Sequence, residues 1–187
     1  MKIPTQLIIL FFFVYTTSLF AQQANRINGF GGPTVSILTI NNQPSFFVGG
    51  QGAILFNKTI AVGGFGMVSL SEVNYRDNND IEINDFKMGL GGFQISYFKE
   101  LNKKVGFTIP ARLYWGELEG LKNNTLELKD SFWGHSLGVG VIYTISDFLK
   151  ITPTYLYNST YLTSFSNSQN FSLSRHQLEI ILLFGGF

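Results

Sequence analysis

The sequence predicts an all-β fold, an eight-stranded antiparallel transmembrane β-barrel, from three observations. Apolar residues alternate with small or polar ones in several segments, and a period of two is typical of β-strands. Beyond the N-terminal segment there is no run of about 18 apolar residues that would predict a membrane-spanning helix. The connections between the segments alternate between short and long, as they do in membrane barrels.

Two segments show the alternation most clearly. From Val105 to Trp115 every second residue is apolar, and the residues between them are Gly, Thr, Pro, Arg and Tyr. The segment from Trp133 to Ile145 repeats this pattern, with an interruption at His135. A helix would not gather these apolar residues on one side. Six further segments complete a set of eight expected strands: 32–40, 46–56, 59–71, 86–98, 149–162 and 173–187.

The connections divide into two sets. Short ones are expected at 57–58, 100–104 and 146–148, and they alternate with longer polar ones at 72–85, 119–131 and 164–172; the short connection at 41–45 is an exception. Tight periplasmic turns and longer extracellular loops are typical of an outer-membrane barrel. An even number of strands then places both ends of the domain on the periplasmic side.

Strand length and aromatic residues fit the same topology. Ten steps of about 3.3 Å, tilted by about 40°, give a strand from Val105 to Trp115 a height of roughly 25 Å, which is the height of the apolar band of such barrels. Trp115 and Trp133 are expected at one level, near the outer interface, and Tyr143 at the opposite interface. A soluble lipocalin-like barrel is the alternative fold. The face opposite the apolar one carries too little charge to favour it.

The first 21 residues are expected to be a signal peptide. Lys2 precedes an apolar run of about 14 residues, and Ala21 supplies a small residue at a cleavage point. Residues 22–187 then form one domain. Removing Lys2 from a chain of net charge +1 leaves this domain near neutrality, which argues against a nucleic-acid partner. Because the chain has no cysteine, a large core or a membrane must stabilise it.

Arg112 and Glu179 are the expected interior site. Both take the inward parity near the middle of their strands. The same assignment places four more polar residues inside: Lys87, Lys150, Arg175 and Gln177. Because an eight-stranded barrel is just wide enough for its own side chains, we expect a buried hydrogen-bonded network here in preference to a route for ions.

No catalytic, cofactor-binding or metal site is expected. His135 and His176 take the lipid-facing parity, and a lipid-modifying enzyme would need a serine or carboxylate oriented toward one of them. Ser136 points to the other face, and Ser174 shares the face of His176 without a third member. The acidic loop 72–85 lacks the glycine and the final carboxylate of a calcium loop, so a solvated loop is favoured over weak binding of a divalent ion.

Several short motifs resemble those of one group of proteins. They are 19–23 at the end of the leader, 29–33 opening the first strand, the glycine-rich segments 62–66 and 89–93, and the terminal Phe187. On these the chain resembles the small outer-membrane β-barrel proteins common in Bacteroidota-type Gram-negative bacteria. The resemblance implies assembly by the barrel insertion machinery, with the terminal aromatic residue as part of the signal. It carries over no catalytic residue.

The last strand departs from this resemblance. If Gln177 and Glu179 face inward, then Phe187 faces inward too, whereas the terminal aromatic residue of such barrels usually faces lipid. A bulge near 185–186 or a different register of the last strand would remove the conflict.

The sequence therefore predicts a monomeric outer-membrane barrel with a structural or surface-interaction role through its extracellular loops. Its expected partners are the lipids of the outer membrane, the barrel insertion machinery and an unknown extracellular partner. A lipid A-modifying hydrolase or acyltransferase is the alternative from a different functional class. A small, porin-like passive pore is the third.

Overall fold

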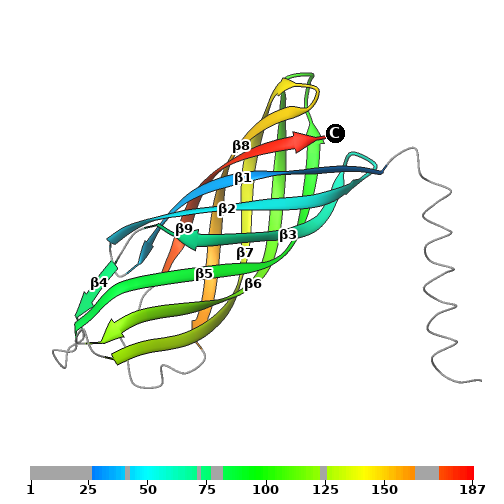
Figure 1. Ribbon diagram of the computed structural model, residues 1–187. Coiled ribbons are helices and arrows are strands. Elements are labelled where there is room, and N and C mark those ends of the chain that lie inside the picture. Colours follow the sequence, from blue (N-terminus) through cyan, green and yellow to red (C-terminus); the bar gives the residue numbers. More distant parts are fainter. Residues whose placement is uncertain (1–26, 41–42, 71–72, 77–81, 123–125, 163–172) are drawn as a thin grey trace, which may run out of the picture.

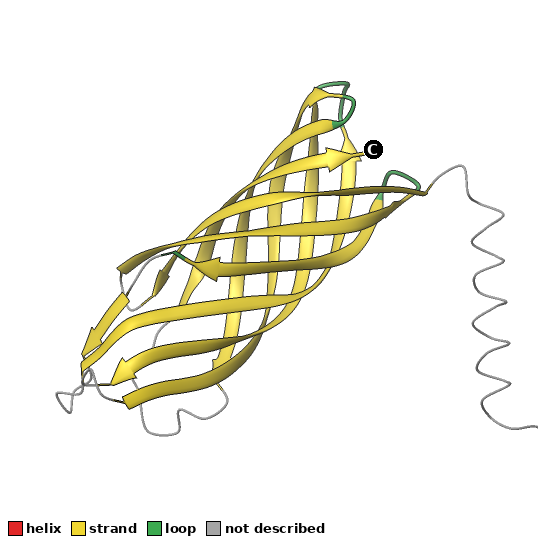
Figure 2. Cartoon of the chain, in the orientation of Figure 1, coloured by secondary structure: helices red, strands yellow, loops and turns green. Residues whose placement is uncertain are grey.

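The computed structural model describes residues 27–40, 43–70, 73–76, 82–122, 126–162 and 173–187. The expected signal peptide lies outside these residues. Every regular element in the described part of the chain is a strand (Figure 2), and no helix in it is long and apolar enough to cross a membrane. The strands are β1 (Ile27–Ile40), β2 (Gln43–Phe56), β3 (Ile60–Ser69), β4 (Val73–Arg76), β5 (Glu82–Glu100), β6 (Val105–Lys122), β7 (Leu126–Ser146), β8 (Leu149–Leu162) and β9 (Leu173–Gly185).

The strands form one closed antiparallel sheet. Apart from β3 and β4, consecutive strands pair along the chain, β9 returns to pair with β1, and β3 pairs with β5. The short β4 pairs with β5 beyond the end of β3, so β3 and β4 are successive pieces of one barrel strand. The predicted eight-stranded antiparallel barrel is therefore confirmed.

The short connections gather at one end of the barrel, together with the C-terminus (Figure 1). In the β2–β3 turn, Asn57 and Lys58 have φ values of 51° and 57°, and the Thr59 N–H donates to the Phe56 carbonyl at 3.0 Å. Positive φ at both central residues defines a type I′ turn, whose twist suits a two-residue hairpin. The β6 strand therefore runs away from this end, and β7 returns to it.

Two of the expected loops are largely strand, which corrects the sequence interpretation. The β6 and β7 strands pair as far as Lys122 and Leu126, inside the expected loop 119–131, and β4 and the start of β5 occupy part of the expected loop 72–85. The expected loop 164–172 lies outside the described residues. We call the paired part of β6 and β7 beyond Trp115 and Trp133 the β6–β7 extension. In it the inward residues Leu118 and Phe132 are buried, while outward positions carry charge. Polar outward residues therefore mark the end of the apolar surface and not the end of the strand.

The outward face of the barrel is apolar, as the alternation predicts. Side chains of the odd-numbered residues of 105–115 and 133–145 point outward, and Leu137 is 59% exposed. Phe93 on β5 is 66% exposed. A soluble lipocalin-like barrel would turn this apolar parity inward, so the structure has the opposite arrangement.

The interior consists of three layers. Apolar clusters fill both ends of the barrel, and polar side chains lie between them. The end of the barrel opposite the short turns, where β6 and β7 are longest, is called the extended end. The cluster there contains Leu38, Ile40, Phe47, Phe65, Met67, Met88, Tyr114, Leu118 and Phe132. The cluster at the short-turn end contains Phe30, Leu55, Ala61, Phe98, Ile142, Ile181 and Leu183. The sequence predicts a polar network in the lumen, but it does not predict the apolar clusters at the two ends of the barrel.

Candidate functional site

An ion pair lies at the centre of the polar layer. The Arg112 Nη1 on β6 is 2.7 Å from the Glu179 Oε1 on β9, and their side chains are 3% and 0% exposed. Arg112 also donates from Nε to the Gln94 Oε1 at 2.6 Å and from Nη2 to the Gln51 Oε1 at 3.2 Å. Its guanidinium carbon lies 4.4 Å from the ring centroid of Phe65. The positive charge is therefore neutralised and hydrogen-bonded inside the barrel.

Gln177 extends this network to two more strands. Its Nε2 donates to the Glu179 Oε1 and to the Ser36 Oγ on β1, both at 2.8 Å. Its Oε1 accepts from the Asn158 Nδ2 on β8, also at 2.8 Å. The hydrogen bonds thus link β1, β2, β5, β6, β8 and β9 across the lumen. We name these seven side chains the lumen network: Ser36, Gln51, Gln94, Arg112, Asn158, Gln177 and Glu179.

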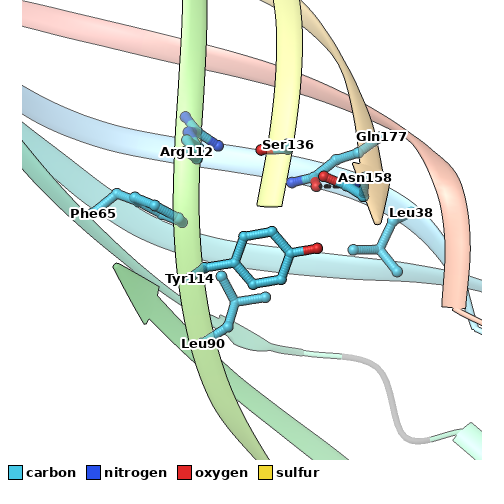
Figure 3. Close-up of a pocket in the computed structure, with 8 residues that line it drawn as sticks. All are labelled: Leu38, Phe65, Leu90, Arg112, Tyr114, Ser136, Asn158 and Gln177. Atoms are coloured by element: carbon cyan, nitrogen blue, oxygen red, sulfur yellow. Dashed lines mark hydrogen bonds between the residues drawn. The ribbon is translucent and has the colours of Figure 1, made fainter. Parts of the chain in front are cut away.

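A small cavity lies beside the lumen network (Figure 3). In the view of Figure 3, polar groups of Arg112, Asn158 and Gln177 lie on one side of the Tyr114 ring. The volume is about 10 Å³, which is the room that one water molecule needs. The buried Ser136 Oγ on its wall has no hydrogen-bond partner among the described residues. The arrangement can hold a water molecule and is far too small for a substrate.

Three other residues were assigned to the interior, and two of these assignments are wrong. Lys150 is buried, and its Nζ lies 2.7 Å from the Glu100 Oε1. Lys87 is exposed, because on β5 the inward side belongs to Met88 and the even-numbered residues that follow it. The glycines at 89, 91 and 92 do not indicate which side of the strand faces inward. Only the charge of Lys87 therefore led to its assignment to the interior.

Arg175 is the second wrong assignment. Its side chain is exposed, and its Nη1 lies 3.5 Å from the hydroxyl of Tyr157, an outward residue of β8. The cause is a register shift in the β1–β9 pairing, where Leu38 pairs with Gln177 but Ile40 pairs with Leu173. Such an irregularity turns side chains away from strict alternation.

The terminal residue closes the short-turn end. The Phe187 ring stacks on Phe30 with a centroid distance of 5.3 Å, and the Lys150 Nζ lies 4.1 Å from the centroid of that ring. The Lys58 Nζ donates to the Phe187 carbonyl at 2.6 Å. Phe187 therefore faces inward, as expected if Glu179 faces inward. Neither a bulge near 185–186 nor a different register of the last strand is needed to explain its position. The outward aromatic residue near the end of β9 is Phe184.

Aromatic side chains form a row on the outward face of β5 to β8. Trp115 and Trp133 pair directly across β6 and β7, which places them at one level. Phe93 contacts Trp115 at a centroid distance of 5.5 Å, and Tyr161 stacks on Trp133 at 4.7 Å. We name the row Phe93, Trp115, Trp133 and Tyr161 the aromatic row. His135 stacks on Tyr161 just below Trp133.

The chain matches no protein-family model and no curated protein, but several solved structures resemble it. Neisserial surface protein A has a TM-score of 0.57 at 12% identity, covering 85% of this chain and 94% of that one. Ail, the attachment invasion locus protein of Yersinia pestis, has a TM-score of 0.50 at 13% identity, covering 85% and 99%. The N-terminal β-barrel domain of Pseudomonas aeruginosa OprF has a TM-score of 0.51 at 11% identity, covering 83% and 97%.

These neighbours are small outer-membrane barrels. The chain has their fold. At such low identity the likeness carries no residue role from one protein to another.

The two histidines lie on the outward face, and each of them contacts a tyrosine. The His176 Nδ1 and the Tyr155 hydroxyl form a hydrogen bond, while His135 packs on Tyr161. Ser136 faces the lumen, on the opposite side of the sheet from both rings. Among the described residues, no three His, Cys, Asp or Glu side chains converge as metal ligands.

Sequence reasoning placed Gln177 inside but missed the other neutral members of the lumen network. Gln51, Gln94 and Asn158 are uncharged, and nothing marks them as partners of a distant arginine. Gln94 and Asn158 do share the inward parity of Ser96 and Leu156, two buried neighbours on their own strands. Collecting every polar residue of inward parity, and not only the charged ones, would have found these two.

Proposed function

We propose that the chain is an outer-membrane barrel that presents a raised sheet for contacts outside the cell, after export through the segment 1–21. An apolar outward face and an aromatic row are the features that lipid and its interface favour. Support for this placement also comes from the fold shared with outer-membrane proteins.

The raised sheet is the β6–β7 extension, and it is the observation that supports the surface role. The β6 strand continues about seven residues beyond Trp115 to Lys122, and β7 begins about seven residues before Trp133. At about 3.3 Å per residue, the paired strands extend roughly 20 Å past the aromatic row. Pairing of β7 with β8 begins only at Phe132. Within the described part of the chain, no strand pairs with residues 126–130 of β7 on the side away from β6.

An unpaired strand edge offers backbone N–H and C=O groups to another chain. A partner that supplies an extended segment can add to such an edge through main-chain hydrogen bonds. The extracellular partner we propose is therefore a protein with an extended segment. A pore agrees less well with the geometry, because the lumen network and the two apolar clusters fill the barrel.

Epitope insertion on intact cells tests the orientation on which this role depends. A short epitope inserted within 123–125, the β6–β7 connection, should be labelled by antibody without permeabilising the cells. The matched control carries the same epitope at Asn102 in the β5–β6 turn and should be labelled only after permeabilisation. The reverse pattern would overturn the proposed orientation.

Photo-crosslinking tests the contact itself. A photoreactive residue at position 128 on the β7 edge should crosslink to another protein on the surface of the native cell, and one at Val141, lower on β7, should not. Equal crosslinking at both positions would contradict the edge as the contact surface.

A further inference from the structure

A cationic and aromatic cluster lies on the outward face where β8 meets β9. Tyr157 pairs with His176 across these strands, with a ring centroid distance of 5.7 Å. The Tyr155 hydroxyl is hydrogen-bonded to the His176 Nδ1, and the Arg175 Nη1 lies 3.5 Å from the Tyr157 hydroxyl. We name these four residues, Tyr155, Tyr157, Arg175 and His176, the β8–β9 cluster.

The β8–β9 cluster lies below the aromatic row, on the side toward the middle of the barrel. Tyr157 pairs with Leu137 on β7, which is the second outward position below Trp133. Its surroundings on the outward face are apolar, because Leu137, Val139 and Leu178 are all well exposed there. A guanidinium at this level can reach the interface while its methylene groups remain on the apolar surface.

No carboxylate from the neighbouring chain segments can neutralise Arg175. The sequence has no Asp or Glu from 148 to 178 or from 27 to 71, so β8, β9, β1, β2 and the connections between them carry none until Glu179. Glu179 lies in the lumen and is bound to Arg112. Most acidic residues of the sequence lie in 72–130 instead. Among the described residues, none of the printed carboxylate ion pairs includes Arg175.

We propose that the β8–β9 cluster binds the phosphate headgroup of an anionic lipid in the outer leaflet. The planar Arg175 guanidinium matches a phosphate group, and it can donate two parallel hydrogen bonds. The phenol groups of Tyr155 and Tyr157 add polar contacts beside it. A single cation near an anionic surface contributes about 1 kcal/mol, which is about a fivefold preference for an anionic lipid.

This inference rests on the membrane placement proposed above, and lipid retention tests the two separately. The full-length folded protein is reconstituted in nanodiscs of phosphatidylcholine with a minor fraction of phosphatidylglycerol. Native mass spectrometry then counts the lipids retained. The unsubstituted chain should retain phosphatidylglycerol in preference to phosphatidylcholine, and Arg175→Gln should lower that preference about fivefold.

Lys129→Gln is the matched control. Lys129 is an exposed cation as well, but it is already paired with Glu117 and Glu119 at 2.8 and 3.1 Å, so its replacement should leave the preference unchanged. An unchanged preference in Arg175→Gln would overturn the lipid site alone. Failure of the unsubstituted chain to enter nanodiscs would overturn the membrane placement and the lipid site with it.

Inorganic phosphate distinguishes a lipid site from a site for soluble anions. Added to the reconstituted protein at millimolar concentration, it should leave the retained phosphatidylglycerol in place, because the acyl chains hold the lipid on the apolar surface. Displacement by phosphate would show that the cluster recognises a free anion, and would overturn the assignment to lipid.

Discussion

At the scale of single residues, Arg112 shows why a charge can remain inside this barrel. Burying an unpaired charge costs several kcal/mol, but Glu179 neutralises this one, and Gln94 and Gln51 accept hydrogen bonds from two of its other N–H groups. The stability of the pair therefore depends on both partners. We propose that the lumen network holds the barrel closed.

Arg112→Ala should be strongly destabilising, because it leaves the Glu179 carboxylate buried without its cation. The expected loss in the free energy of unfolding is about 3–5 kcal/mol, measured by urea titration of the folded protein in detergent. The double variant Arg112→Met with Glu179→Leu should recover a large part of that loss, since no charge then remains. A single variant as stable as the unsubstituted chain would show that the network does not stabilise the barrel.

Gly134 illustrates how glycines admit large inward rings. A Cβ at this position would meet the Ser159 carbonyl oxygen at 2.5 Å and the Tyr114 hydroxyl at 2.6 Å. Gly134→Ala should therefore lower the free energy of unfolding by about 1–3 kcal/mol. Gly66→Ala is the control, since its Cβ would come no closer than 3.9 Å to the Leu90 carbonyl oxygen. Equal effects of the two substitutions in urea titrations would refute this role of Gly134 in packing.

At the scale of elements, the sequence predicts the strands better than it predicts their ends. Alternation is strong where the outward side is apolar, as in Val105 to Trp115, because apolar and small residues then differ clearly. It weakens in the β6–β7 extension, where outward Glu117 and Lys129 resemble loop residues although the strand continues. It also fails along the glycines of β5, so the side of Lys87 was assigned wrongly.

The ion pair at the short-turn end should make this end sensitive to acid. The hydrogen bond from Lys150 holds the pKa of Glu100 below its usual value of 4.5, partly opposed by burial, and the charges of Lys150 and Lys58 lower it further. Because the folded-state pKa is lower than the unfolded one, this stabilisation is fully present above the usual value and is lost as pH falls through the lowered pKa.

Glu100→Gln measures that contribution. The unsubstituted chain should unfold at a higher temperature than Glu100→Gln at neutral pH, and the difference should shrink as pH falls below 4.5 and disappear below the lowered pKa of Glu100. Heating followed by gel electrophoresis gives the midpoint at each pH. A difference that grows on acidification would contradict a lowered pKa for the Glu100 carboxyl in the folded barrel.

At the scale of the whole molecule, inside and outside are reversed relative to a soluble barrel. The outward face is apolar over the middle of the strands, while most charged side chains of the described residues lie in the lumen, at the short-turn end or beyond the aromatic row. The fold class and the two faces of β6 and β7 follow from the alternation of apolar residues in the sequence. The lumen network depends on contacts across the barrel, such as Arg112 with Glu179, which no local pattern encodes.

The register of the tryptophans gives the last prediction. Trp115 and Trp133 are direct partners on the outward face, so they should lie at one depth, near the headgroups. In vesicles containing lipids brominated at defined positions, the single-tryptophan variants Trp115→Phe and Trp133→Phe should give the same quenching profile, strongest for bromine close to the headgroup. Replacing both and placing a tryptophan at Val139, well below the row on the same face of β7, should move the maximum toward the bilayer centre. Profiles that differ between the first two variants, or a Val139→Trp profile identical to theirs, would contradict the orientation of the barrel in the membrane.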